Sequence, residues 1–147
     1  MDIEPFSFQI EVDDLGIIRS CLSGAFDVKT WAETRDAVIA RDVKGINLNN
    51  RPIIADISQL SAPIDMWKEH IKGMRKYEEE RGIYFGRNAV ITGERNEAII
   101  LARYYAALIT AEFQAPREIK IFKTFDEGYA WVIEGWPGDV SADPSTS

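Results

Sequence analysis

Cysteine and histidine are almost missing from this sequence of 147 residues, which contains one of each. A single cysteine, Cys21, excludes an internal disulfide and a zinc site built from several thiolates; in a strand it is expected to be a small buried hydrophobic residue. The histidine, His70, has no serine or cysteine nucleophile at a recognisable spacing. We therefore predict no catalytic residue, metal site or cofactor, and expect His70 to be a packed or half-exposed helix residue.

Long apolar runs and clusters of basic residues are also lacking. No stretch approaches the roughly 18 consecutive apolar residues of a membrane span, and the first residues are acidic where a signal peptide would be basic. Lys and Arg number 17 against 24 Asp and Glu, a formal charge of −7. Nucleic acid and anionic membranes are thus disfavoured as partners, and we expect a cytoplasmic protein.

The length and the hydrophobic fraction of 46% fit one soluble domain with a core large enough to fold without disulfides. We assign residues 1–136 to this domain. The segment 137–147 has no apolar periodicity, so we predict that it is a disordered C-terminal tail.

The first half of the sequence predicts a hairpin, a helix and a buried strand. Apolar and polar residues alternate over 6–12, and a second run over 17–23 follows turn residues, which indicates two antiparallel strands. From Asp27, a good N-cap, apolar residues at helical spacing indicate a helix that Gly45 would end. The short apolar run 53–57 is typical of a parallel strand covered on both faces.

The second half alternates helices and strands. We predict a helix over 63–82, a strand over 83–93, a helix over 94–113 and a strand over 118–124. The segment TFDE is then a capping box, with Thr124 as N-cap and Glu127 at the third position of the last helix. The order ββαβαβαβα predicts an α/β fold, with a mixed sheet of about five strands and about four helices.

Three stretches resemble the STAS domain, the fold shared by bacterial anti-sigma-factor antagonists and the cytoplasmic ends of sulfate transporters. They are RPIIADISQLSAPIDMW, GRNAVITG and EIKIFKTFDEGYAWV, and together they follow the order of elements across nearly the whole chain. The chain looks most like small uncharacterised bacterial proteins described as STAS-like or SEC14-like. The resemblance implies a non-enzymatic regulatory module that binds another protein or itself. The resemblance to SEC14-like proteins implies the alternative, a carrier that binds a small apolar ligand or lipid between helix and sheet.

The resemblance also marks a candidate interaction or switch loop, made of Asp56, Ser58, Ser61, Asp65 and Trp67. In phosphoregulated STAS proteins this segment carries an aspartate and a serine, which Asp56 and Ser58 match, and a later aspartate that Asp65 roughly matches. Met66 and Trp67 stand where hydroxyl residues would be expected, and this departure argues against a phosphorylation switch.

Two interpretations of this segment stay open on physical grounds. Pro63 is favoured at the first helical position, so the Ser61 side chain could cap the helix that follows. Alternatively, a phosphate on Ser61 would lie favourably near a helix N-terminus, although it would add about −1.5 to −2 charge close to Asp65.

The aromatic residues suggest packing rather than ligand binding. Tyr104, Tyr105 and Trp131 lie in apolar helices and are expected in the core or at a dimer contact, whereas Trp136 is less easily buried. Two-fold homodimers are the commonest way to cover an exposed apolar patch, so a homodimer is also expected.

Overall fold

A computed structural model describes residues 4–42, 51–82, 86–112, 118–134 and 136. The strands are β1 Ser7–Val12, β2 Ile18–Ala25, β3 Ile53–Ser61, β4 Asn88–Ile91 and β5 Ile119–Phe122. The helices are α1 Val28–Asp42, α2 Ile64–Glu80, α3 Asn96–Ala107 and α4 Phe125–Glu134, and a π-helical segment, η1 Leu108–Glu112, continues α3. The predicted order of elements is confirmed. Gly45, 83–85 and the tail 137–147 lie outside the described residues.

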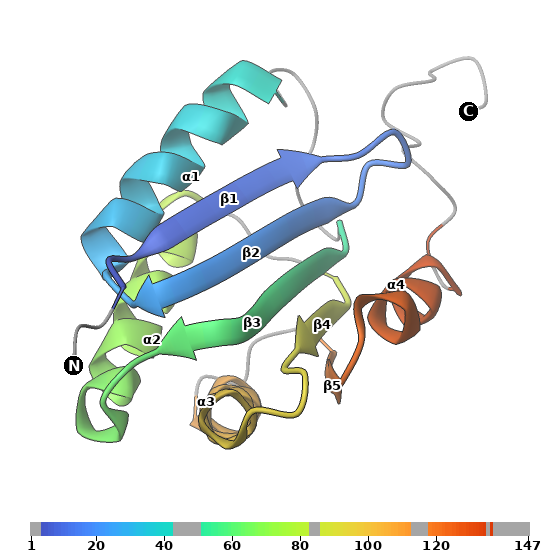
Figure 1. The fold of residues 1–147 in the computed structure, drawn as a ribbon. Helices are drawn as coiled ribbons and strands as arrows, with labels where there is room; N and C mark the ends of the chain where they lie inside the picture. Colours follow the sequence, from blue (N-terminus) through green and yellow to red (C-terminus); the bar gives the residue numbers. More distant parts are fainter. Residues whose placement is uncertain (1–3, 43–50, 83–85, 113–117, 135, 137–147) are drawn as a thin grey trace, which may run out of the picture.

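The five strands form one mixed sheet in which spatial order follows chain order (Figure 1). β1 and β2 are antiparallel, and β2, β3, β4 and β5 run parallel. The hairpin turn is held by Asp13, whose Oδ1 accepts hydrogen bonds from the backbone N–H groups of Leu15 and Ile17. Gly16, with φ of +84°, takes the left-handed conformation that this turn requires.

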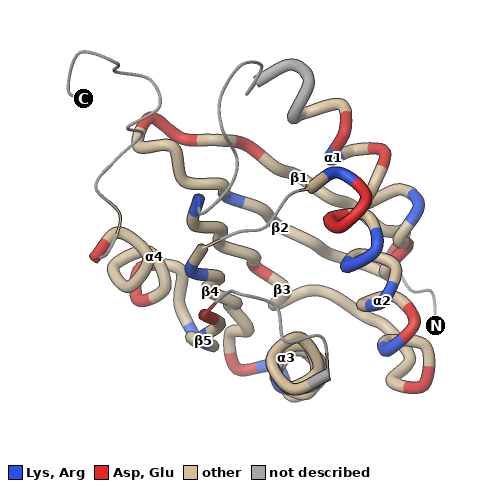
Figure 2. The backbone as a smooth tube through the Cα atoms, turned by 180° about the vertical axis from the view of Figure 1, so that it is seen from behind, with Lys and Arg blue, Asp and Glu red and all other residues tan. Residues whose placement is uncertain are grey.

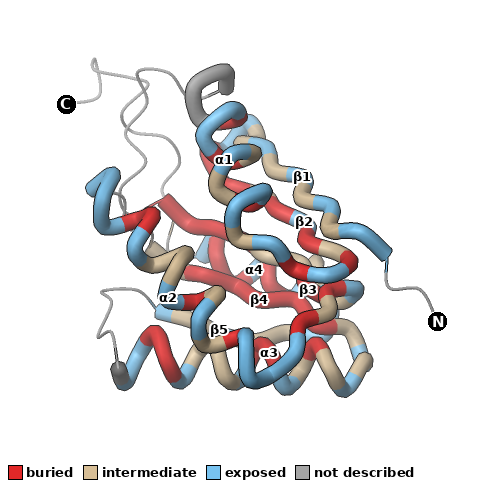
Figure 3. The backbone as a smooth tube through the Cα atoms, turned by 90° about the vertical axis from the view of Figure 1, so that its left-hand side faces the viewer, coloured by how far each residue is buried: buried red, intermediate tan, exposed pale blue. Residues whose placement is uncertain are grey.

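Helices cover the two faces of the sheet unequally. α1, α2 and α3 pack on one face over the larger core, which includes Leu22, Ile57 and Val90. α4 packs on the other face over Ile54 and Ala89. Figure 3 shows the buried central strands between these layers.

The α4 face remains uncovered where Gln9, Glu11 and Cys21 are exposed. The prediction that Cys21 is buried was therefore wrong, because its side of β2 faces solvent. Burial of part of the side chain and, to a lesser extent, the nearby Asp56 carboxylate raise the pKa of its thiol.

The predicted helix starts are confirmed at α1 and α4. The Asp27 carboxylate accepts a hydrogen bond from the backbone N–H of Thr30 at 3.1 Å. Thr124 Oγ1 accepts one from the backbone N–H of Glu127 at 3.3 Å and donates to the Glu127 carboxylate at 2.9 Å. Local side-chain chemistry therefore begins both helices, as N-capping predicts.

The aromatic side chains pack as the sequence suggests. Tyr104 and Tyr105 are half-buried against the larger core, and Trp131 of α4 is buried in the core on the other face of the sheet. Trp136 is half-buried, because its indole N–H donates a hydrogen bond of 2.7 Å to the carbonyl of Leu15 in the hairpin turn.

Candidate functional site

The carboxyl ends of the parallel strands meet at one edge of the sheet, and the four α-helices within the described residues all begin there. Such edges are the usual place for ligand and partner sites in α/β folds, because loops and helix N-termini gather there. The predicted site segment runs through this edge, from the end of β3 into α2.

Strand β3 is longer than the sequence predicted. It continues past Ile57 to Ser61, so Asp56, Ser58 and Ser61 belong to a strand, and the interpretation of 56–61 as a loop was wrong. The register explains this: Cys21 pairs with Asp56 but Ser23 pairs with Gln59, so β3 carries one more residue than β2 in this interval. This bulge interrupts the apolar alternation by which strands are recognised.

Asp56 and Ser58 contact each other at the bulge. The Asp56 carboxylate accepts a hydrogen bond of 2.9 Å from the backbone N–H of Ser58, and both residues are half-buried. The extra residue is thereby held by a local side-chain bond of the kind that aspartate commonly makes two residues along the chain.

Ser61 does not cap α2. Pro63 occupies the N-cap position, and no side chain bonds to the first turn of the helix. The Ser61 hydroxyl instead donates a hydrogen bond of 3.2 Å to the Glu97 carboxylate, which also accepts the backbone N–H of Ala62 at 3.3 Å. The capping interpretation was therefore wrong, because the strand carries Ser61 towards α3.

Arg95 fastens the end of β3 to α3, and sequence analysis missed it. Its guanidinium donates hydrogen bonds to the backbone carbonyls of Ser58 and Leu60 and pairs with Glu97 at 2.7 Å. The partners are strand carbonyls more than 30 residues away, so no local sequence pattern could have indicated this role.

Trp67 and Asp65 lie in the first turns of α2 but differ in burial. Trp67 is only 3% exposed, and its indole N–H donates a hydrogen bond of 3.0 Å to the carbonyl of Leu101 in α3. Trp67 is thus a core residue and not part of an interaction loop. Asp65 is exposed in the first turn, where a carboxylate complements the helix dipole.

Three large apolar side chains are exposed beside these residues. Ile64 and Met66 in the first turn of α2 are 49% and 51% exposed, and Ile100 in α3 is 55% exposed. Ile100 lies three residues after Glu97 on α3, and the next residue, Leu101, accepts the hydrogen bond from Trp67 of α2. We call Ile64, Met66 and Ile100 the α2–α3 patch. Charged residues of both signs lie along α2, whereas most of α3 is uncharged, as Figure 2 shows.

His70 is a packed residue, as predicted. It is half-buried, and its ring lies 5.0 Å from that of Phe26. Burial lowers the pKa of the imidazole below its ordinary value, and the Asp27 carboxylate partly opposes this shift. Among the described residues, no three His, Cys, Asp or Glu side chains gather as metal ligands would, and no described helix is long and apolar enough to span a membrane.

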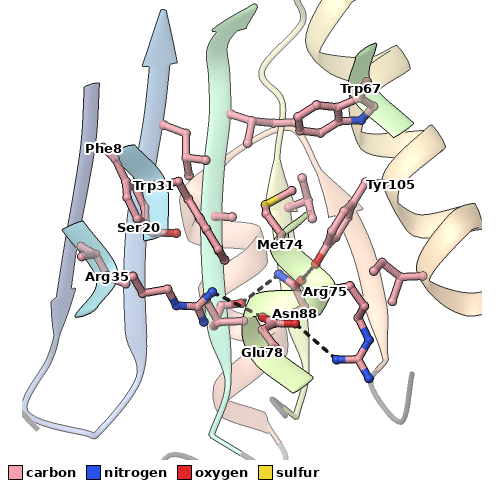
Figure 4. Close-up of a pocket in the computed structure, with 17 residues that line it drawn as sticks. Phe8, Ser20, Trp31, Arg35, Trp67, Met74, Arg75, Glu78, Asn88 and Tyr105 are labelled. Atoms are coloured by element: carbon pink, nitrogen blue, oxygen red, sulfur yellow. Dashed lines mark hydrogen bonds and ion pairs between the residues drawn. The ribbon is translucent and has the colours of Figure 1, made fainter. Parts of the chain in front are cut away.

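A cavity of about 70 Å³ lies between the sheet and α1, α2 and α3 (Figure 4). Most of its wall is apolar, including Trp31, Met74 and Val90. One end of the cavity is polar. The residues there are Arg35, Arg75, Glu78, Asn88 and Tyr105.

The polar end of the cavity is linked by ion pairs and hydrogen bonds. Glu78 pairs with Arg35 at 3.3 Å and with Arg75 at 3.5 Å, although the Glu78 and Arg35 side chains are only 6% and 3% exposed. Tyr105 donates a hydrogen bond of 2.9 Å to the Asn88 side-chain oxygen. In the sequence, helical spacing aligns Trp67, Ile71, Met74 and either Tyr77 or Glu78 on one side of the helix predicted over 63–82. No local pattern indicates the distant partner of Glu78, Arg35.

No protein-family model and no curated protein matches the chain. Several solved structures are similar to it, among them the following two. An uncharacterised protein from the DUF3478 family with a SpoIIAA-like fold, from Shewanella loihica PV-4, aligns with a TM-score of 0.61 and 16% identity over 90% of this chain and 98% of its own. The anti-sigma factor antagonist SpoIIAA in its unphosphorylated form aligns with a TM-score of 0.50 and 14% identity over 87% of this chain and 97% of its own.

The chain has a STAS-like fold. Within it, the α2–α3 patch lies at the carboxyl edge of the parallel strands, and the cavity lies under the three helices of the larger core. Two separate places in this STAS-like domain could therefore bind something, one on the surface and one inside.

Proposed function

We propose that this protein is a regulatory interaction module that binds another protein through the α2–α3 patch. The observation that carries the proposal is the exposure of Ile64, Met66 and Ile100 on adjoining helices. On soluble proteins, exposed patches of large apolar side chains often mark sites of protein–protein interaction.

The contacts that hold the α2–α3 patch in place favour binding through a preformed surface. Trp67 anchors the start of α2 to α3, and Arg95 and Glu97 fasten the end of β3 to α3. An exposed patch on elements fixed in this way loses little conformational freedom on binding, which favours affinity.

The similarity to an anti-sigma factor antagonist supports a regulatory role over an enzymatic one. The lipid-carrier alternative has weaker support, because the cavity of about 70 Å³ is smaller than the ~300–1,000 Å³ of ordinary small-molecule pockets.

The binding role does not require a phosphate on Ser61. The hydroxyl already lies 3.2 Å from a Glu97 carboxylate oxygen, and a phosphate there would bring like charges together. Arg95 would offset part of that repulsion, so a Ser61→Asp variant belongs in the experiment as the test of a switch.

The proposal is tested by affinity capture with the full chain from cells that naturally produce it. The Ile64→Lys, Met66→Lys double variant should lose the captured protein while keeping its melting temperature. The matched control is Ile133→Lys on α4, where a 38% exposed isoleucine lies on the other face of the sheet; it should capture the same protein as the wild type.

Light scattering on the same variants separates self-association from capture of another protein. A wild-type dimer that the double variant breaks would identify the partner as a second copy of the chain. Equal capture by wild type and double variant, with both folded, would overturn the proposal.

A further inference from the structure

The cavity under α2 contains buried hydrogen-bond donors that the described residues do not fully use. Arg75 Nε is buried and donates no hydrogen bond; its nearest described partner is the exposed Glu79 carboxylate at 3.6 Å. The side-chain nitrogen of Asn88 makes two contacts, both at the long distance of 3.4 Å. A buried donor without a good acceptor is unfavourable, so this end of the cavity favours an incoming acceptor.

The charge of the polar end favours an anion. Among the described wall residues, two guanidinium groups, those of Arg35 and Arg75, face the buried carboxylate of Glu78. Two carboxylates outside the wall, Glu79 near Arg75 and Asp36 near Arg35, have side chains that are 62% and 50% exposed, and ion pairs in water contribute little.

The rest of the cavity fits a short hydrocarbon. Trp31, Met74, Val90 and Ile109 supply apolar surface opposite the polar end (Figure 4). The volume of about 70 Å³ is roughly five times the ~10–15 Å³ of cavity space that one water molecule needs. A chain of a few carbons fits such a space, whereas a lipid tail does not.

An irregular helix adjoins the same cavity. η1 contains the cavity residue Ile109, and where it begins the N–H of Leu108 is shared between the carbonyls of Tyr104 and Tyr105. π-helical segments within α-helices occur frequently at functional sites. This backbone feature is independent of the charges on α1 and α2 and points to the same place.

We propose that this cavity binds a short-chain monocarboxylate. The carboxylate oxygens accept hydrogen bonds from Arg75 Nε and the Asn88 side-chain nitrogen, and the hydrocarbon lies against Trp31, Met74 and Val90. The site is separate from the α2–α3 patch, so it stands whether or not the patch binds a protein.

The four tryptophans allow a direct test by protein-observed NMR with sodium butyrate as the probe. Trp31 and Trp67 line the cavity, whereas Trp131 and Trp136 belong to the α4 side. Butyrate should shift the indole N–H signals of the first two saturably and leave the other two in place. Equal, unsaturable shifts of all four would overturn the proposal, as would no shift.

Three ligands define the chemistry of the site. Butyramide, which has nearly the same shape but no charge, should bind at least tenfold more weakly than butyrate. Decanoate should bind no more tightly than butyrate, because its chain exceeds the cavity. Equal binding of the amide would overturn the anionic site, and tighter binding of decanoate would favour the lipid-carrier alternative instead.

Two variants locate the site. Arg75→Gln should raise the dissociation constant for butyrate at least tenfold, while Arg103→Gln, an exposed arginine on α3, should leave it unchanged. Ala55→Val fills the cavity without touching a charged group and should abolish binding with the melting temperature kept or raised. Undiminished binding in Ala55→Val would show that butyrate binds elsewhere.

Discussion

The two ends of α2 reverse the usual distribution of residues between surface and core. At its start, Ile64 and Met66 are exposed; near its end, the charged Glu78 is 4% exposed. Between them the helix is ordinary, with Trp67 and Ile71 buried and lysines and glutamates outside. Departures of this kind cost stability, so they are expected where a protein binds something.

The comparison assigns different physical roles to the two ends. At the start of α2, apolar side chains are exposed to water and would be buried only by a binding partner. Near its end, a buried charged side chain needs oppositely charged groups within the fold. Measurements on matched variants along one helix can therefore separate a binding surface from a buried polar site.

The largest effect is expected from Glu78→Ala. Removing this carboxylate breaks the buried ion pair that it forms with the Arg35 guanidinium at 3.3 Å, and breaking a buried pair costs about 3–5 kcal/mol. The free energy of unfolding from urea titration measures the effect. Glu80→Ala, in the same turn but exposed, should change it by less than about 0.5 kcal/mol, and equal losses in the two variants would contradict a structural role for the pair.

A smaller effect is expected just before α2, at the end of β3, from Ser61→Ala. Losing the hydrogen bond to Glu97 should cost about 1 kcal/mol of unfolding free energy. In a Glu97→Ala background the same change should cost much less, because the partner is already absent. An undiminished cost in that background would return Ser61 to the capping role.

The exposed end should tolerate truncation. Met66→Ala should change the free energy of unfolding by less than about 0.5 kcal/mol, as is usual at exposed positions. Ile71→Ala, one turn further and fully buried, should cost about 2–5 kcal/mol. A large loss at Met66 would mean that the patch packs within the chain and is not available to a partner.

The smallest effect concerns pH. The folded-state pKa of His70 is lowered, so its neutral form is favoured and its contribution to stability is present above the unfolded pKa of about 6.5. That contribution is lost as the pH falls through the folded-state pKa. Melting curves should show the wild type losing slightly more stability than His70→Gln between about pH 7 and pH 5. Parallel curves would show that burial does not affect the imidazole.

Much of the fold could be predicted because its signals are local. Alternation predicted the hairpin, Asp27 and Thr124 marked helix starts, and the spacing of Trp67, Ile71 and Tyr77 gave the buried stripe of α2. Each depends on residues within a turn or two of one another, where sequence patterns carry the most information.

The candidate site was predicted less well because its contacts are distant in sequence. The bulge in β3 depends on pairing with β2, and the Ser61 hydroxyl is directed by Glu97, 36 residues away. Arg95 acts on strand carbonyls through its side chain. Propensity assigns such residues to loops and helix ends, and only tertiary packing reveals their partners.

The sheet order has a consequence for how the chain folds. Every strand pairs with its neighbour in the sequence, so each new pairing closes only a hairpin or one strand–helix–strand unit. Short closures keep the relative contact order low for a mainly parallel sheet, and low contact order goes with fast folding. As the chain leaves the ribosome, each new strand would meet an edge already formed by the one before it, and no strand would have to insert between two others.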